Sequence, residues 1–181
     1  MKEKFNFENS TLIAGLGNPG NEYERTFHNA GAQFVSFAVI QHGENIGWKK
    51  HSSGLFTYAK REGRIFLVPL VFMNESGSAI LRALSFFKIP AEKMIIAHDD
   101  SDIGIESYKI DYGRGAAGHR GVANVMNVLG TKSFWRIRIG IRDMREEKRM
   151  KAETFVLSRE TREEKAALER TFLSILEETH L

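Results

Sequence analysis

Residues 11–20 read Thr-Leu-Ile-Ala-Gly-Leu-Gly-Asn-Pro-Gly, a short apolar strand that runs into a glycine-rich loop. Residues 30–41 follow with apolar side chains at helical spacing. The alternation continues with a hairpin at 55–60 and 64–70, a helix at 76–88, strands at 94–97 and 106–112, a helix at 119–129, a strand at 134–141, and a last helix after the capping box 161–164. This order predicts an α/β fold, a single-domain three-layer sandwich with a mixed, mostly parallel twisted sheet flanked by helices.

The composition fits one soluble domain. With 181 residues, the chain is expected to form a single domain over residues 1–181. It has no cysteine, which excludes disulfides, thiolate metal sites and cysteine nucleophiles and fits a reducing cytoplasm. The N-terminal segment is too charged for a signal peptide, and no run of about 18 apolar residues offers a membrane span. We therefore expect a cytoplasmic protein without a membrane segment.

Positive charge is concentrated late in the chain, although the net charge is only +3. Residues 136–151 contain seven basic and three acidic side chains. Within them, the strand at 134–141 alternates apolar residues with arginines, so we expect it to be half-exposed with one basic face. Such a face favours a polyanionic partner, whereas an ordinary solvated helix with Glu–Lys pairs is the alternative explanation of the charge pattern.

The glycine loop matches the pattern G-x-G-x-x-G, but its context does not fit a dinucleotide site. That site requires a helix that starts inside the motif and an acidic residue about 20 positions later. Here the helical periodicity starts near Ala30, and no acidic residue lies between Glu24 and Glu44. The loop is better interpreted as a tight turn that presents Asn18 at the end of a strand. A turn residue that bonds its own backbone is the alternative for Asn18.

His28 and Asp99 are the candidates for acid–base chemistry. His28 stands where the loop becomes a helix, a position that keeps an imidazole neutral and able to accept a proton. Asp99 directly follows a buried apolar strand, where a carboxylate needs a partner, and a histidine suits it. A capping or packing role is the alternative for His28. The six histidines lack the spacing of a metal site, so no metal is expected.

The remaining polar residues of these motifs have smaller expected roles. No Gly-x-Ser-x-Gly elbow is present, and Ser76 fits an N-cap or the first turn of a helix, so water activated by His28 is the simpler nucleophile. Asn74 lies at a loop-to-helix junction, where its amide can bind a carbonyl or ribose oxygen or can cap the helix. Asp100 and Asp102 are expected to be solvated or to lie in turns. His98 is expected to pack in its strand, and the alternative is that it supports a residue of the site.

Taken together, these motifs resemble those of bacterial-type peptidyl-tRNA hydrolases. The matching blocks follow one another in order from about Leu12 to Leu157, and each is weak alone, whereas the ordered set is highly specific. They are Gly17-Asn-Pro-Gly20, Tyr23 with His28-Asn-Ala-Gly31, Phe72-Met-Asn74 with Ser76-Gly77, His98-Asp99, Gly118-His119, Arg136-Ile-Arg-Ile-Gly-Ile141 and Phe155-Val-Leu157.

The resemblance implies a metal-free and cofactor-free monomeric enzyme that cleaves the ester between a peptide and the 3′ ribose of tRNA. It implies that His28 activates water and that Asp99 orients His28. Asn18 and Asn74 bind the peptide backbone and the terminal nucleotide, while Tyr23 and Met73 line the cleft. His119 belongs to the rim that contacts the acceptor end of tRNA. We expect this contact to be independent of tRNA sequence, because it is made mainly to phosphates.

Three positions depart from the family pattern. Arg120 replaces the asparagine that usually follows the Gly-His pair, which exchanges a donor and acceptor for a donor alone. Val71 stands where threonine is common. Asp111 stands where a second basic residue is common, and only Lys109 is kept. We therefore expect the grip on tRNA to depend on four arginines, namely Arg114, Arg120, Arg136 and Arg138.

The sequence is also compatible with two other functions. A non-catalytic RNA-binding protein on the same fold is the main alternative, and Arg120 is the feature that favours it. A hydrolase of small esters without an RNA partner is a third reading, which the basic residues argue against.

Overall fold

The computed structural model describes residues 11–41, 47–143 and 151–181. In this part of the chain, seven strands form one sheet in the order β2-β3-β4-β1-β5-β7-β6. Their bounds are β1 Leu12–Gly15, β2 Lys49–Lys50, β3 Phe56–Arg61, β4 Arg64–Pro69, β5 Met94–Gly104, β6 Tyr108–Tyr112 and β7 Trp135–Arg142. Strands β4, β1, β5 and β7 pair in parallel, and the pairs β2–β3, β3–β4 and β6–β7 are antiparallel. The prediction of a mixed, mostly parallel sheet is confirmed.

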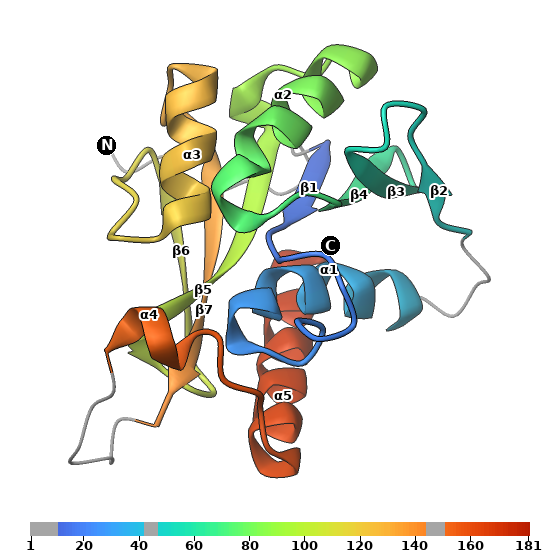
Figure 1. The fold of residues 1–181 in the computed structure, drawn as a ribbon. Helices are drawn as coiled ribbons and strands as arrows, with labels where there is room; N and C mark the ends of the chain where they lie inside the picture. Colours follow the sequence, from blue (N-terminus) through green and yellow to red (C-terminus); the bar gives the residue numbers. More distant parts are fainter. Residues whose placement is uncertain (1–10, 42–46, 144–150) are drawn as a thin grey trace, which may run out of the picture.

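Helices cover both faces of this sheet (Figure 1). Helices α1 (Ala30–Gln41) and α5 (Arg162–Thr179) pack on one face, and α2 (Ser76–Phe87) and α3 (Arg120–Leu129) pack on the other. A short helix, α4 (Ala152–Phe155), lies beyond the end of β7. The described ranges also contain 3-10 turns at Phe27–Asn29, Met73–Glu75 and Ala91–Lys93. The three-layer sandwich is therefore confirmed. None of the helices in the described ranges is both long and apolar enough to cross a membrane.

Close contact between α1 and the sheet depends on glycine. A Cβ added at Gly31 would lie 2.2 Å from the carbonyl oxygen of Ala97 in β5, and one added at Gly15 would lie 2.2 Å from the carbonyl oxygen of Gly31. Both obstacles are backbone atoms, so a side chain at either position requires the helix to move. Two backbone hydrogen bonds, Leu16 N to Ala97 O and Ala32 N to Leu16 O, fix the same junction. The glycines thus bring the start of α1, and with it the 3-10 turn that carries His28, onto the end of β1 and the middle of β5.

Strand β5 is longer than the apolar run at 94–97 predicted. It continues through His98-Asp99-Asp100 to Gly104, because β7 supplies partners for this polar segment, from His98 opposite Arg138 to Asp100 opposite Gly140. Asp99 therefore lies within a strand of the central sheet and not in a loop beyond it. Its partner in β7 is Ile139, whereas β1 on the other side of β5 pairs only as far as Ala97.

The prediction that residues 134–141 form a half-exposed strand with a basic face is wrong. In β7 most side chains are buried, and the side chain of Arg136 is among the largest that are fully buried, at 1% exposure. Helices cover both faces at this point, so the alternation of isoleucine and arginine reflects two buried faces, one apolar and one polar. Of the other basic residues in this region, Arg145, Lys148 and Arg149 lie outside the described residues.

Candidate active site

His28 and Asp99 meet as the sequence predicted. His28 Nδ1 lies 2.9 Å from Asp99 Oδ1, and their side chains are 12% and 2% exposed. His28 is held in the 3-10 turn before α1, where its backbone N–H bonds the carbonyl oxygen of Val156. Because an ionised carboxylate only accepts hydrogen bonds, the Nδ1–H of His28 donates to Asp99. The Nε2 lone pair is then free to accept a proton.

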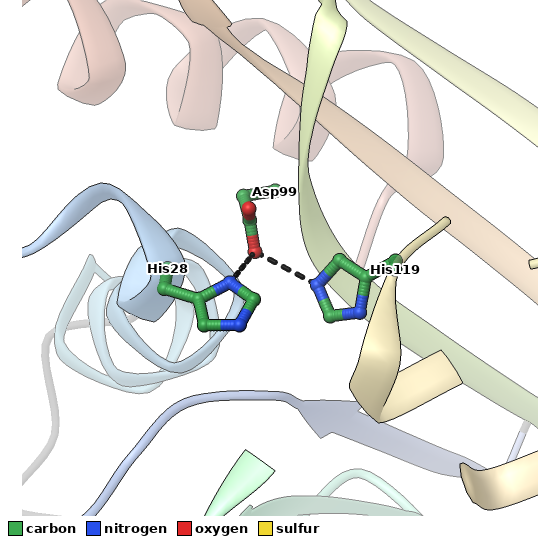
Figure 2. Close-up of side chains that lie close together, drawn as sticks. All are labelled: His28, Asp99 and His119. Carbon is green, nitrogen blue, oxygen red and sulfur yellow. Dashed lines mark hydrogen bonds and ion pairs between the residues drawn. The ribbon is translucent and has the colours of Figure 1, made fainter. Parts of the chain in front are cut away.

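His119 is a second partner of the same oxygen. Figure 2 shows His28 and His119 on either side of Asp99, with His119 Nε2 lying 2.8 Å from Asp99 Oδ1. His119 Nδ1 accepts a hydrogen bond from Val122 N, which caps helix α3 and leaves the proton on Nε2. The side chain is only 7% exposed but lines the cavity, and the predicted contact of His119 with the acceptor end of tRNA stays a prediction. His119 is an internal donor to Asp99.

The two histidines keep Asp99 ionised. Burial alone would raise the pKa of this carboxyl group, but attraction and a hydrogen bond from His119, together with the hydrogen bond from His28, hold the pKa far below its usual range. His98 behaves differently: burial lowers the pKa of its imidazole, which packs edge-on to His119 at 4.6 Å between ring centroids. The packing role expected for His98 is confirmed.

His28, Asp99 and His119 line a cavity of about 550 Å³ between α3 and α4. Polar catalytic candidates and apolar side chains share its lining, so the cavity can hold both a reacting ester and an apolar chain. The lining residues are Asn18, His28, Phe72, Met73, Asn74, Asp99, Asp100, Ser101, Asp102, Ala117, Gly118, His119, Arg120, Ala152, Glu153, Val156 and Leu157.

Asn18 joins two of the sequence motifs. Its Oδ1 accepts from Met73 N at 2.8 Å, so its Nδ2 group is left to donate at the cavity wall. The loop itself is fixed by Asn29, whose Oδ1 accepts from Asn18 N at 2.8 Å and whose Nδ2 donates to Asn18 O at 2.9 Å. Sequence reasoning did not assign this role to Asn29, although the residue stands next to His28 in the same motif. The side chain of Asn18 thus bonds a distant backbone group, and the alternative of a turn residue that bonds its own local backbone is wrong.

The second asparagine is exposed at the cavity. Asn74 lies in the 3-10 turn before α2, and neither that turn nor the helix uses it as an N-cap. Met73 lines the cavity as expected, with 5% exposure. Tyr23 does not line the cavity and instead packs edge-on to Phe72, at 6.2 Å between ring centroids, so it supports the wall from behind. Ser76 begins α2 and donates to Met73 O, as expected of a first-turn residue.

Two of the predicted RNA-binding arginines are internal. Arg136 is buried and does not reach the cavity. Arg138 bonds Asp100 Oδ2 through Nε at 2.8 Å and Asp111 Oδ2 through Nη1 at 2.7 Å, and these bonds raise its pKa despite burial. The expectation that Asp100 is solvated is therefore also wrong. Arg114 and Arg120 remain exposed, as does Lys109.

The three central side chains also form a group that could hold a metal ion. His28, Asp99 and His119 each offer one ligand atom, and these atoms lie within 4.8 Å of one another; no other such group was found in the described ranges. Two imidazoles and a carboxylate suit Zn²⁺. In the present arrangement, however, these atoms are directed at one another in hydrogen bonds. The absence of a metal requirement stays a prediction.

Comparisons with known proteins show the family to which the chain belongs. The sequence profile of the family "Peptidyl-tRNA hydrolase" matches residues 12–181. The chain is 36% identical to peptidyl-tRNA hydrolase of Marinobacter nauticus over 167 residues, or 91% of this chain and 84% of the relative. It is 35% identical to that of Mycoplasma mycoides subsp. mycoides over 167 residues, or 92% of this chain and 89% of the relative.

Solved structures give the same result. The crystal structure of peptidyl-tRNA hydrolase from Acinetobacter baumannii matches with a TM-score of 0.83 and 29% identity, over 98% of this chain and 90% of that chain. The matched residues include every side chain of the cavity described above. The chain belongs to the peptidyl-tRNA hydrolase family.

Proposed function

We propose that this protein hydrolyses the ester of peptidyl-tRNA with water that His28 activates. Asp99 orients His28 through a hydrogen bond, and His119 holds Asp99 through a second one. The reaction itself follows from the family: the chain is an enzyme that hydrolyses peptidyl-tRNA. What is proposed is the assignment of residues to steps. The observation that supports it best is the 2.9 Å contact between His28 and Asp99 at the wall of a cavity that Asn18 and Asn74 also line.

The proposed hydrolysis has two steps, and one base, His28, serves both of them. His28 Nε2 takes a proton from water while the water oxygen bonds the ester carbonyl carbon, which gives a tetrahedral intermediate. The bond from this carbon to the 3′ oxygen of the ribose then breaks, and the proton on Nε2 passes to that leaving oxygen. Asp99 holds the Nδ1–H of His28 throughout, which steadies the imidazolium formed between the two steps.

The two asparagine amides are suited to the negative charge of the intermediate. Asn18 has its Oδ1 committed to Met73 N, so its Nδ2–H groups can donate to the developing oxyanion. Asn74 is exposed at the same wall and can bind the carbonyl or the terminal ribose. Phe72, Val156 and Leu157 offer apolar surface for the peptide.

Exposed cations on the α3 side of the cavity are proposed to hold the acceptor end of tRNA. Arg120 lines the cavity, while Arg114 and Lys109 are exposed on the glycine loop and on β6. Contacts of this kind go mainly to phosphates, so binding is independent of sequence and weakens with salt. We further propose that the enzyme is a monomer and that it acts in the cytoplasm.

Replacement of the base tests the assignment. His28→Ala should lower the turnover of peptidyl-tRNA by at least about 10²-fold, the smaller end of general-base effects. His180→Asn is a matched control, because it replaces a histidine far along the chain that has positive φ, a conformation that asparagine tolerates. Near-normal turnover by a folded His28→Ala protein would remove His28 from the mechanism.

The alternative of an RNA-binding protein without activity is not favoured by the family and its relatives. It predicts that the purified protein binds peptidyl-tRNA without releasing peptide. A single incubation with labelled peptidyl-tRNA distinguishes the two outcomes.

A further inference from the structure

One ion pair joins the two walls of the cavity. Arg120 Nη2 lies 2.7 Å from Glu153 Oε1. Arg120 is the first residue of α3, Glu153 lies in α4, and both line the cavity that contains His28 and Asp99. The pair therefore stands beside the position of the reacting ester. It also involves Arg120, one of the three positions at which this chain departs from the family pattern.

Arg120 can readily exchange Glu153 for another anionic partner. The side chains of Arg120 and Glu153 are 69% and 77% exposed, and ion pairs of such exposure add little net stability. Glu153 uses a single guanidinium nitrogen of Arg120, and the other nitrogens form no hydrogen bond with the part of the chain that the structure describes. A guanidinium fork binds a phosphate through two parallel hydrogen bonds. A phosphate at the cavity is thus a stronger partner for Arg120 than the carboxylate it meets in the free protein.

We infer that Arg120 binds a phosphate at the 3′ end of the substrate RNA and that Glu153 competes for Arg120 when no substrate is bound. This inference rests on the proposed function and adds a determinant of substrate affinity to it. Glu153 raises KM by holding Arg120 and by repelling the approaching phosphate. Displacement of the carboxylate is therefore part of substrate binding.

The arrangement of charge favours phosphate over the other available anion, a carboxylate of the peptide. Arg120 lies on the same wall as the glycine loop, which carries exposed Arg114. The opposite wall holds Ala152, Val156 and Leu157, which suit the apolar parts of a peptide. The nucleotide end of the substrate thus belongs on the side of Arg120.

Three variants test the competition: Glu153→Gln, Arg120→Asn, which introduces the residue usual in the family, and the double variant. Hydrolysis of peptidyl-tRNA is measured at several salt concentrations. Glu153→Gln should lower KM by about threefold or more and leave kcat within about twofold. Arg120→Asn should raise KM by about tenfold and reduce the slope of log(kcat/KM) against log[salt] by about 1, since one phosphate contact is lost.

The double variant separates competition from simple repulsion. If Glu153 acts largely by holding Arg120, Glu153→Gln lowers KM much less in the Arg120→Asn background than in the natural one. Equal effects in both backgrounds would mean two independent charges and would overturn the inference. A rise in KM for Glu153→Gln would overturn it as well, because the carboxylate would then be positioning Arg120 for the substrate.

A binding assay distinguishes the two anions and does not depend on catalysis. Uncharged tRNA and a free peptide with an acidic side chain are titrated separately against the natural protein and the Arg120→Asn variant. Weaker binding of tRNA alone supports the phosphate assignment, and weaker binding of the peptide alone contradicts it. Because no turnover is measured, a failure of the His28 mechanism would leave this result intact.

Discussion

His28 and His119 donate hydrogen bonds to the same oxygen atom, Asp99 Oδ1, at 2.9 and 2.8 Å. Their ring centroids are 4.9 Å apart. The two rings nevertheless differ in how many of their nitrogens form hydrogen bonds within the protein. His119 is fixed at both nitrogens, by Asp99 and by Val122 N, whereas His28 is fixed at Nδ1 alone and faces the cavity. This difference supports the proposal that His28 acts on the substrate and that His119 positions the carboxylate.

Removal of the second donor should reduce turnover without unfolding α3. His119→Asn keeps a residue that caps a helix well but cannot bring a ring nitrogen to Asp99. We expect kcat to fall by about tenfold, in line with the free energy of one hydrogen bond to a charged group. Thermal unfolding of the variant provides the control for capping. Unchanged kcat would show that His28 alone is enough to hold Asp99 in position.

Local sequence patterns predicted most of the fold, because helical periodicity and capping depend on neighbouring residues. Helices α1, α2 and α3 begin and end within a few residues of the predicted positions, and α5 begins at the predicted capping box. The length of β5 was not predictable in this way. Its polar half is a strand because β7, distant in sequence, pairs with it.

The site was predicted in part. The contact between His28 and Asp99 followed from residue types and from the family resemblance. The contact between His119 and Asp99 did not, since it depends on how α3 approaches β5. The burial of Arg136 was missed for a related reason: alternation indicates that a strand has two faces but does not reveal that helices cover both of them.

Asn18 should have separable structural and catalytic roles. Its Oδ1 accepts from Met73 N, and its Nδ2 group is proposed to donate to the oxyanion. Asn18→Asp keeps an acceptor for Met73 N and removes the donor. We expect kcat/KM to fall by about 10²-fold, as when an oxyanion donor is lost elsewhere, with little change in thermal stability. Asn18→Ala, which loses both contacts, should also be less stable. A fully active Asn18→Asp enzyme would exclude the proposed donor.

Asp111 is expected to weaken the attraction of RNA. Its carboxylate binds Arg138 at 2.7 Å and Arg114 at 3.5 Å, and the hydrogen bond from Arg138 lowers its pKa despite the opposing effect of burial. Asp111→Asn should lower KM for peptidyl-tRNA by about threefold at low salt and steepen the salt dependence, because exposed Arg114 is freed. Glu106→Gln is the matched control, since it neutralises an acid that pairs with Arg170 on α5. Equal effects of the two changes would contradict a local role of Asp111.

Metal ions should inhibit the enzyme and not activate it. The proposed mechanism uses an imidazole to activate water, so dialysis against EDTA should leave turnover unchanged. Added Zn²⁺ should bind His28, Asp99 and His119 and displace the protons from the ring nitrogens, so inhibition should strengthen as pH rises. Loss of activity on chelation, with recovery on adding a metal, would require a different mechanism. His119→Asn should weaken the inhibition by Zn²⁺, because it removes one ligand.

Asp99 should make the stability of the fold sensitive to acid. Its pKa is held far below the value of about 3.9 that an unfolded aspartate has, because hydrogen bonds and attraction from His119 and His28 outweigh the effect of burial. The unfolded chain therefore binds a proton at a pH where the folded chain does not. The stabilisation from ionised Asp99 is fully present above about pH 4 and is lost as the pH falls below it.

Urea unfolding of the natural protein and of Asp99→Asn, from about pH 5 down to about pH 2.5, measures this contribution. The free energy of unfolding should fall more steeply with acid in the natural protein than in Asp99→Asn, so that the two curves converge. Asp102→Asn, which removes an exposed carboxylate nearby in the same strand, should run parallel to the natural protein. Parallel curves for Asp99→Asn as well would mean that the two histidines do not stabilise the charged form of Asp99, and the electrostatic basis of the site would have to be abandoned.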